Sequence, residues 1–300
     1  MKHILKTKKI SLILWATFPV IFGMFFTSFI LSVFKIEKVL KSKDNQASVI
    51  QLIPKDTETI KPQYFYLNKN GNGQPKISAK AFLVGDLNTG EVILSKNQNQ
   101  KFPIASTSKL MTALVAAKIN IPDNTTQITK KILATTGANG ELKLGEKIKV
   151  ADLIYPLLLE SSNDAAEALA QYFGRDNFIS KMNQQAEKLQ MTGTSYKDPS
   201  GLAYHNQSTT SDMFKLAGYI MQQQPDLFKI TTKRSYSNKK HSWSNISQFL
   251  GKDGYLGGKS GYTDPAKQTV VSLFNLPLGQ TGFRPIAITL LQSSDRQKDI

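Results

Sequence analysis

Three short motifs, separated by long stretches of chain, limit what this sequence can fold into. An S-x-x-K motif lies at Ser106–Lys109, an S-x-N motif at Ser161–Asn163 and a K-S-G motif at Lys259–Gly261. The first pattern alone is weak, since it also occurs at Ser32–Lys35 and Ser237–Lys240. In this order, however, the three describe a serine site that is served by lysine. The fold therefore has to bring three distant segments into one place.

The first motif supplies a nucleophile and a base. A serine hydroxyl attacks well only when a base removes its proton. On a helix Ser106 and Lys109 stand at positions i and i+3, so their side chains face the same way. A lysine amine can be that base only when it is neutral, which burial and a nearby cation favour. Lys259 is a candidate for that cation, and the pattern predicts acyl transfer.

The second motif supplies polar groups for the rest of that reaction. We expect the Ser161 hydroxyl to carry a proton to the leaving amine, as a bridge between lysines. The amide of Asn163 offers a donor and an acceptor for a substrate amide. The oxyanion of a tetrahedral intermediate needs two N–H donors, for which the backbones of Ser106 and Tyr262 are the natural pair.

The third motif suits a substrate that ends in a carboxylate. A fixed cation and a hydroxyl donor recognise such a group, and Lys259 and Ser260 provide them. Gly261 removes a side chain where backbone must approach the substrate.

Each motif also has an ordinary structural explanation. Ser106 is a plausible helix N-cap, and so are Ser162 and Asn163. The stretch Lys259–Gly261 is equally compatible with a simple turn. Taken singly these explanations are better, but together they require three accidental matches in the expected order.

The first part of the chain predicts a membrane anchor. Ile10–Phe34 is a run of 25 residues without a charge. This length spans a bilayer and exceeds the usual core of a signal peptide. We expect a cytoplasmic tail and an uncleaved transmembrane helix within residues 1–43, a polar linker over 44–75 and a catalytic domain over 76–300. A long cleaved signal peptide is the alternative. Lysines flank both ends of the run, so charge alone does not fix its orientation.

Composition excludes several other classes of site. The chain has 38 basic and 22 acidic residues, a net charge of +16, and no cysteine. Disulfides, zinc-thiolate sites and a cysteine nucleophile are therefore excluded. The positive charge is spread along the chain without a basic-aromatic or recognition-helix pattern, so we expect no nucleic-acid partner. Attraction to an anionic envelope surface is the simpler interpretation. We expect no metal and no other cofactor.

Apolar patterning predicts a mixed α/β domain. Short apolar runs at 79–84 and 91–94 indicate a hairpin, and 268–276 and 285–292 indicate two strands. Helices are expected after Pro103 and over 149–160, 163–173, 176–189 and 211–223, with Asp176 and either Ser211 or Asp212 as caps. Since strands lie at both ends of this region, the sheet should join them.

The motifs and their surroundings resemble those of D-alanyl-D-alanine carboxypeptidases, the low-molecular-mass penicillin-binding proteins. The similar segments are Phe102–Leu114, Leu144–Ala170, Asp198–Leu202, Trp243–Asn245 and Gly257–Thr263. The resemblance covers about residue 76 to the C-terminus. It implies the serine β-lactamase/transpeptidase fold, with an antiparallel sheet and helices on both faces.

The resemblance also implies roles for individual residues. Ser106 is the residue acylated, Lys109 its base, and Ser161 and Asn163 complete the polar network. Lys259 and Ser260 bind the terminal carboxylate, although relatives usually have threonine at the position of Ser260. The implied substrates are peptidoglycan stem peptides outside the cytoplasm, and β-lactams are the implied inhibitors. The closing helix of the family is expected to be absent or very short.

Three other functions compete with trimming of the terminal D-alanine. The motifs do not separate a carboxypeptidase from an endopeptidase that cuts peptidoglycan crosslinks. A class A β-lactamase needs a glutamate-activated water. Glu167 and Glu187 both fall on predicted helices, and no E-x-x-N motif is present, so rapid deacylation is not expected. A non-catalytic envelope-binding module would not require Ser106, Lys109 and Lys259 together.

Overall fold

The computed structural model describes residues 75–119, 123–277 and 282–300. The expected anchor within 1–43, and all but the last residue of the expected linker, lie outside these ranges. None of the helices in the described ranges is long and apolar enough to cross a membrane.

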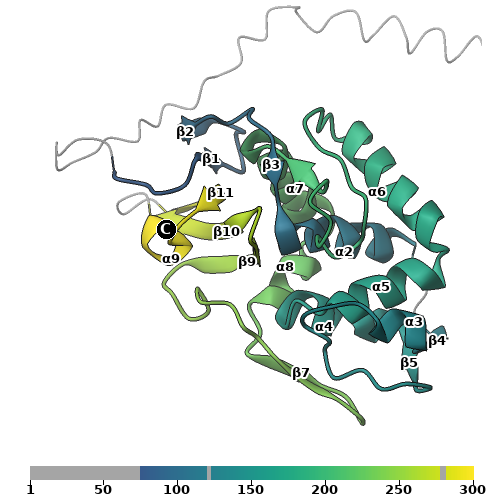
Figure 1. Cartoon of the computed structure of the whole chain (residues 1–300). Coiled ribbons are helices and arrows are strands. Elements are labelled where there is room, and N and C mark those ends of the chain that lie inside the picture. Colours follow the sequence, from purple (N-terminus) through teal and green to yellow (C-terminus); the bar gives the residue numbers. More distant parts are fainter. Residues whose placement is uncertain (1–74, 120–122, 278–281) are drawn as a thin grey trace, which may run out of the picture. The chain divides into compact units, whose positions relative to one another are not determined.

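A five-stranded sheet, in the order β2-β1-β11-β10-β9, lies on one side of the described domain, with most of the helices on the other (Figure 1). Its strands are β1 (Ala81–Asp86), β2 (Val92–Lys96), β9 (Tyr255–Thr263), β10 (Lys267–Pro277) and β11 (Phe283–Ser293). All neighbouring strands are antiparallel, and Ala81 of β1 lies opposite Leu291 of β11. This pairing confirms that the sheet joins the two ends of the domain.

Helices fill the middle of the sequence, and several of them pack on the sheet. They are η2 (Ala105–Ser108), α2 (Lys109–Lys118), α3 (Lys130–Leu133), η3 (Val150–Leu153), α4 (Ile154–Leu159), α5 (Asn163–Tyr172), α6 (Arg175–Lys188), α7 (Thr210–Gln223), α8 (Asp226–Thr231) and α9 (Arg296–Asp299). Helix α7 packs on β1 and β11, and α8 packs on β9. The short α9 is the last helix of the described residues and packs on β10 and β11.

Three short antiparallel pairs complete the described domain. They are β3 (Phe102–Pro103) with β6 (Gln207–Ser208), β4 (Thr125–Gln127) with β5 (Lys147–Lys149), and β7 (Ser235–Ser237) with β8 (Ser242–Ser244). The main core lies among the helices and includes Leu110, Leu157 and Trp243. A smaller apolar cluster around Phe82 and Phe249 packs separately from the main core. Both clusters draw on residues of the sheet.

Two predicted helix caps are wrong. Helix α6 begins at Arg175 behind Gly174, whose φ of 79° is a conformation that glycine adopts at little cost. Asp176 therefore lies in the first turn rather than at the cap. The cap of α7 is Thr209, whose hydroxyl accepts a hydrogen bond from the backbone nitrogen of Asp212 at 3.0 Å.

Strand β9 is the one strand of the five-stranded sheet that apolar patterning did not predict. Glycine is unfavourable in strands, and three glycines occur within this one. Close packing explains two of them. A Cβ atom at Gly258 would lie 2.3 Å from the carbonyl oxygen of Val271 in β10, and one at Gly261 would lie 2.6 Å from the backbone nitrogen of Ser106. The K-S-G motif is thus part of a strand, and its interpretation as a simple turn is wrong.

Candidate active site

The first motif lies where η2 passes into α2. Ser106 is in η2 and Lys109 is the first residue of α2, and their Oγ and Nζ atoms are 2.9 Å apart. Neither helix has a side-chain cap, so Ser106 is not the helix cap that the simpler explanation required. Ala105 has a φ of 47°, a strained conformation for a residue with a side chain. The backbone strain therefore sits directly before the serine.

Lys109 is fully buried among oxygen atoms. Its Nζ atom lies 2.7 Å from Oδ1 of Asn163 and 2.7 Å from the carbonyl oxygen of Ser200. Burial is the main cause that lowers the pKa of Lys109 well below its usual value, and the positive charge of Lys259 lowers it further, whereas Asp198 acts in the opposite direction. A neutral amine has two N–H bonds and one lone pair. Two carbonyl-type acceptors take the N–H bonds, which leaves the lone pair for the hydroxyl of Ser106.

The second motif separates α4 from α5. Ser162 caps α5, since its hydroxyl accepts a hydrogen bond from the backbone nitrogen of Ala165 at 3.0 Å. The cap interpretation is thus right for Ser162. Asn163 is held by its Nδ2 atom, which donates to the carbonyl oxygen of Thr136 at 2.6 Å, so that its Oδ1 atom faces Lys109. Ser161 has a φ of 63°, and its hydroxyl makes no hydrogen bond within the described ranges.

The third motif lies on β9, against η2. Lys259 is 5% exposed, and its Nζ atom donates to the carbonyl oxygen of Ser260 at 2.6 Å. Burial, followed by the positive charge of Arg296, lowers the pKa of Lys259 to about 7. Tyr262, whose side chain is 57% exposed, donates its hydroxyl to Asp264. The structure therefore brings Ser106, Lys109, Asn163 and the K-S-G motif together.

Arg296 is a second cation at this end of the site, and it belongs to none of the three motifs. Its Nη1 atom donates to the carbonyl oxygen of Gly261 at 2.7 Å. Lys259 and Arg296 thus gather positive charge beside β9 and make this region suitable for an anion. Arg296 is the first residue of α9, which packs on β10 and β11, and no local pattern around residue 296 indicates this position.

A family model described as D-alanyl-D-alanine carboxypeptidase matches residues 68–275. The chain belongs to this family. It is therefore a serine peptidase by family, as the resemblance implied.

Relatives include both D-alanyl-D-alanine endopeptidases and D-alanyl-D-alanine carboxypeptidases. A D-alanyl-D-alanine endopeptidase of Escherichia coli strain K12 is 31% identical over 210 residues, which are 66% of this chain and 67% of that one. A D-alanyl-D-alanine carboxypeptidase of the same strain is 30% identical over 239 residues, which are 74% of this chain and 58% of that one. The chain thus spans less than two thirds of the second relative.

The fold matches solved structures of penicillin-binding proteins. Penicillin-binding protein D2 from Listeria monocytogenes, in the cefotaxime bound form, has a TM-score of 0.67 and 27% identity. The match covers 76% of this chain and 94% of that one. The expected mixed fold, with an antiparallel sheet and packed helices, is confirmed.

Proposed function

We propose that this chain is a serine-type D-Ala-D-Ala carboxypeptidase that removes the terminal D-alanine of peptidoglycan stem peptides. The observation that carries the proposal is the buried amine of Lys109, 2.9 Å from the hydroxyl of Ser106. Burial keeps this amine available as a base, and the family membership supports the substrate class.

Acylation follows from this geometry. Lys109 takes the proton of Ser106 while the Oγ atom attacks the carbonyl carbon of the penultimate D-alanine. The backbone N–H groups of Ser106 and Tyr262 would stabilise the oxyanion of the tetrahedral intermediate. Its collapse breaks the peptide bond, and the leaving amine would take the proton from Lys109, with the Ser161 hydroxyl as the proposed relay. A water molecule then hydrolyses the ester and restores the serine.

The carboxylate of the substrate would lie between Lys259, Ser260 and Arg296. The buried Lys259, the partly buried Arg296 and a hydroxyl match a terminal carboxylate, and charge-assisted hydrogen bonds are the stronger kind. Gly261 leaves room for the substrate beside Ser106. Serine in place of the usual threonine retains the hydroxyl, so Ser260→Thr should remain active.

Endopeptidase action on crosslinks is the main alternative, since one relative named above is a D-alanyl-D-alanine endopeptidase. Incubation of the purified protein with pentapeptide and with crosslinked muropeptides separates the two. Released D-alanine from the pentapeptide supports the carboxypeptidase. Cleavage of crosslinks alone, with the pentapeptide intact, supports the endopeptidase.

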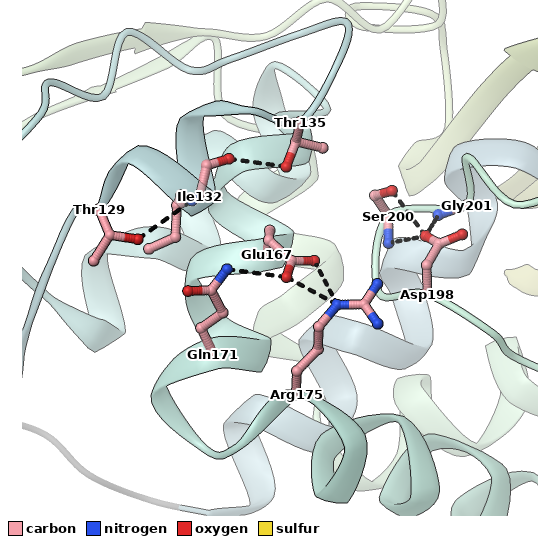
Figure 2. Close-up of polar contacts among 9 residues, drawn as sticks. All are labelled: Thr129, Ile132, Thr135, Glu167, Gln171, Arg175, Asp198, Ser200 and Gly201. Carbon is pink, nitrogen blue, oxygen red and sulfur yellow. Dashed lines mark hydrogen bonds and ion pairs between the residues drawn. The ribbon is translucent and has the colours of Figure 1, made fainter.

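β-Lactams are the proposed inhibitors, and turnover of them is the weaker alternative. They mimic the D-Ala-D-Ala amide and should acylate Ser106. Glu167, which is the candidate for activating a deacylating water, is instead held by Arg175 at 2.9 Å and by Gln171 at 3.1 Å (Figure 2). These hydrogen bonds occupy the carboxylate oxygens that would have to activate a water, so the acyl-enzyme should be long-lived.

We also propose that Ile10–Phe34 anchors the protein, with the catalytic domain outside the cytoplasm and a linker over 44–75. The proposal is supported by the 25-residue apolar run and by the extracytoplasmic location of the substrate. Protease added to intact spheroplasts should remove the catalytic domain. Protection of the domain would show the opposite orientation.

A further inference from the structure

The loop that follows α6 is folded around one carboxylate, that of Asp198. Its Oδ1 atom accepts hydrogen bonds from the backbone nitrogen and hydroxyl of Ser200, at 2.7 and 2.8 Å, and from the nitrogen of Gly201 at 2.6 Å (Figure 2). Its Oδ2 atom accepts from the nitrogen of Ala203 at 2.5 Å. Asp198 is 8% exposed, and all four donors are neutral. The charge on this buried group therefore remains uncompensated by its hydrogen-bond partners.

This loop contacts the nucleophile segment at three points. The carbonyl oxygen of Ser200 accepts from Nζ of Lys109 at 2.7 Å. The carbonyl oxygen of Pro199 accepts from the hydroxyl of Thr112 at 2.5 Å. A Cβ atom at Gly201 would lie 1.9 Å from the carbonyl oxygen of the residue before Ser106. The position of the Ser200 carbonyl beside the lysine therefore depends on how Asp198 folds the loop.

Charge links the same carboxylate to Lys109. Burial and Lys259 lower the pKa of Lys109, and Asp198 is the group that raises it. The loop also borders a cavity of about 270 Å³, lined in addition by Lys131, Glu167 and Arg175. The last two are paired with each other at 2.9 Å, so their charges largely cancel.

We propose that Asp198 is a positioning residue for Lys109: it holds the Ser200 carbonyl on the amine and supplies the negative charge that opposes Lys259 there. The inference rests on the proposed role of Lys109 as the base. The Asp198 side chain then has two separable effects. One is on the position of the Lys109 amine, and the other is on the pH range in which this amine is neutral.

Asp198→Asn separates the two effects. Three of the four hydrogen bonds reach the single atom Oδ1, so an asparagine whose carbonyl oxygen takes this place retains them. Only the nitrogen of Ala203 loses its acceptor. The loop should persist while the charge is lost, and the amine of Lys109 should then lose its proton more easily.

The test is the pH profile of penicillin acylation, measured by stopped-flow or intact-mass spectrometry. In Asp198→Asn the acid limb should move to lower pH, with a plateau near that of the wild type, so that the variant reacts faster than the wild type in acid. Asp198→Glu keeps the charge but displaces the oxygens. The acid limb of the pH profile of Asp198→Glu should stay at the wild-type pH, while its maximum acylation rate falls.

Asp212→Asn is the matched control. The Asp212 carboxylate is 3% exposed, accepts hydrogen bonds from Gly193 and Thr194 near the start of the same loop, and pairs with Lys215 at 3.4 Å. Loss of the Asp212 charge should leave the acid limb of the acylation pH profile at the wild-type pH.

Two results overturn the inference: an unshifted limb in Asp198→Asn, whatever its plateau, or an equal shift in the control. Failure of the proposed function looks different. The wild type would then fail to acylate, or Lys109→Ala would acylate normally.

Discussion

Gly201 lies against Ala105 so closely that a Cβ atom added to it would stand 1.9 Å from the Ala105 carbonyl oxygen. The same Cβ would lie 3.0 Å from the backbone nitrogen of Ser106. Two segments that are far apart in the sequence thus meet directly behind the proposed nucleophile. The strained φ of 47° at Ala105 occurs at this contact.

Gly201→Ala should therefore damage both stability and acylation. Its φ of 90° is unfavourable for alanine, which alone costs about 1–2 kcal/mol. The clash with the Ala105 carbonyl comes in addition and displaces Ser106. Urea unfolding and the rate of penicillin acylation measure the two effects.

Gly251→Ala provides the control for the backbone cost. Gly251 has a φ of 83°, but no atom lies within 4 Å of the position of an added Cβ. We expect only the backbone cost and normal acylation. Equal losses in the two variants would show that the contact with Ala105 is not what requires glycine at position 201.

Carboxylate binding should weaken as the pH rises above about 7. Lys259, with its pKa lowered to about 7, is charged below that pH and neutral above it. An anion binds the charged amine, so above pH 7 binding takes up a proton and the affinity falls by up to about tenfold per pH unit. Calorimetry of a D-Ala-D-Ala peptide on Ser106→Ala, from pH 6 to 9, measures this dependence. The amidated peptide should bind weakly at every pH, and equal binding of acid and amide would contradict the carboxylate site.

Asp164→Asn should stabilise the protein at neutral pH. Asp164 is 1% exposed, its Oδ1 atom has no hydrogen-bond partner in the described ranges, and burial raises its pKa from 3.8 to about 6. Because the folded state holds this proton more tightly, stability is lost as the pH rises from about 4 through about 6. The melting temperature of the variant should exceed that of the wild type at pH 7.5 but not at pH 4.

Asp226→Asn is the matched control for that measurement. Asp226 is also in a first helical turn, but its side chain is 83% exposed in an ion pair with Lys229. Surface pairs of this kind contribute about 0–1 kcal/mol, so the melting temperature should barely change at either pH. A gain of equal size in both variants would show that burial of Asp164 is not the cause.

The parts of the fold and the site that could be predicted are those that a local sequence pattern encodes. The strands β1, β10 and β11 are apolar runs, and residues 106 and 109 share a helix face by spacing alone. Strand β9 escaped prediction because its glycines serve tertiary contacts rather than strand propensity. The roles of Arg296 and Asp198 depend on where α9 packs on the sheet and on which loop contacts α2, and no local pattern contains that information. The role of the Ser200 carbonyl could not be predicted either, since every residue has a backbone carbonyl and the sequence does not distinguish one from another.

The base role of Lys109 has its own test. Loss of a general base typically costs about 10²–10⁴-fold in rate, so Lys109→Ala should slow penicillin acylation by this factor while its melting curve remains cooperative. The nearby Lys118, also on α2, donates to Gln185 and lies outside the site. Lys118→Ala should acylate at the wild-type rate. Near-normal acylation of Lys109→Ala at neutral pH would contradict the assignment of the base.

The most direct test of the account is the intact mass of the protein after incubation with benzylpenicillin. The wild type should gain the mass of one penicilloyl group, and peptide mapping should place it on Ser106. Ser106→Ala should show no adduct under the same conditions. An adduct of unchanged yield in Ser106→Ala would contradict the account and assign the nucleophile to another residue.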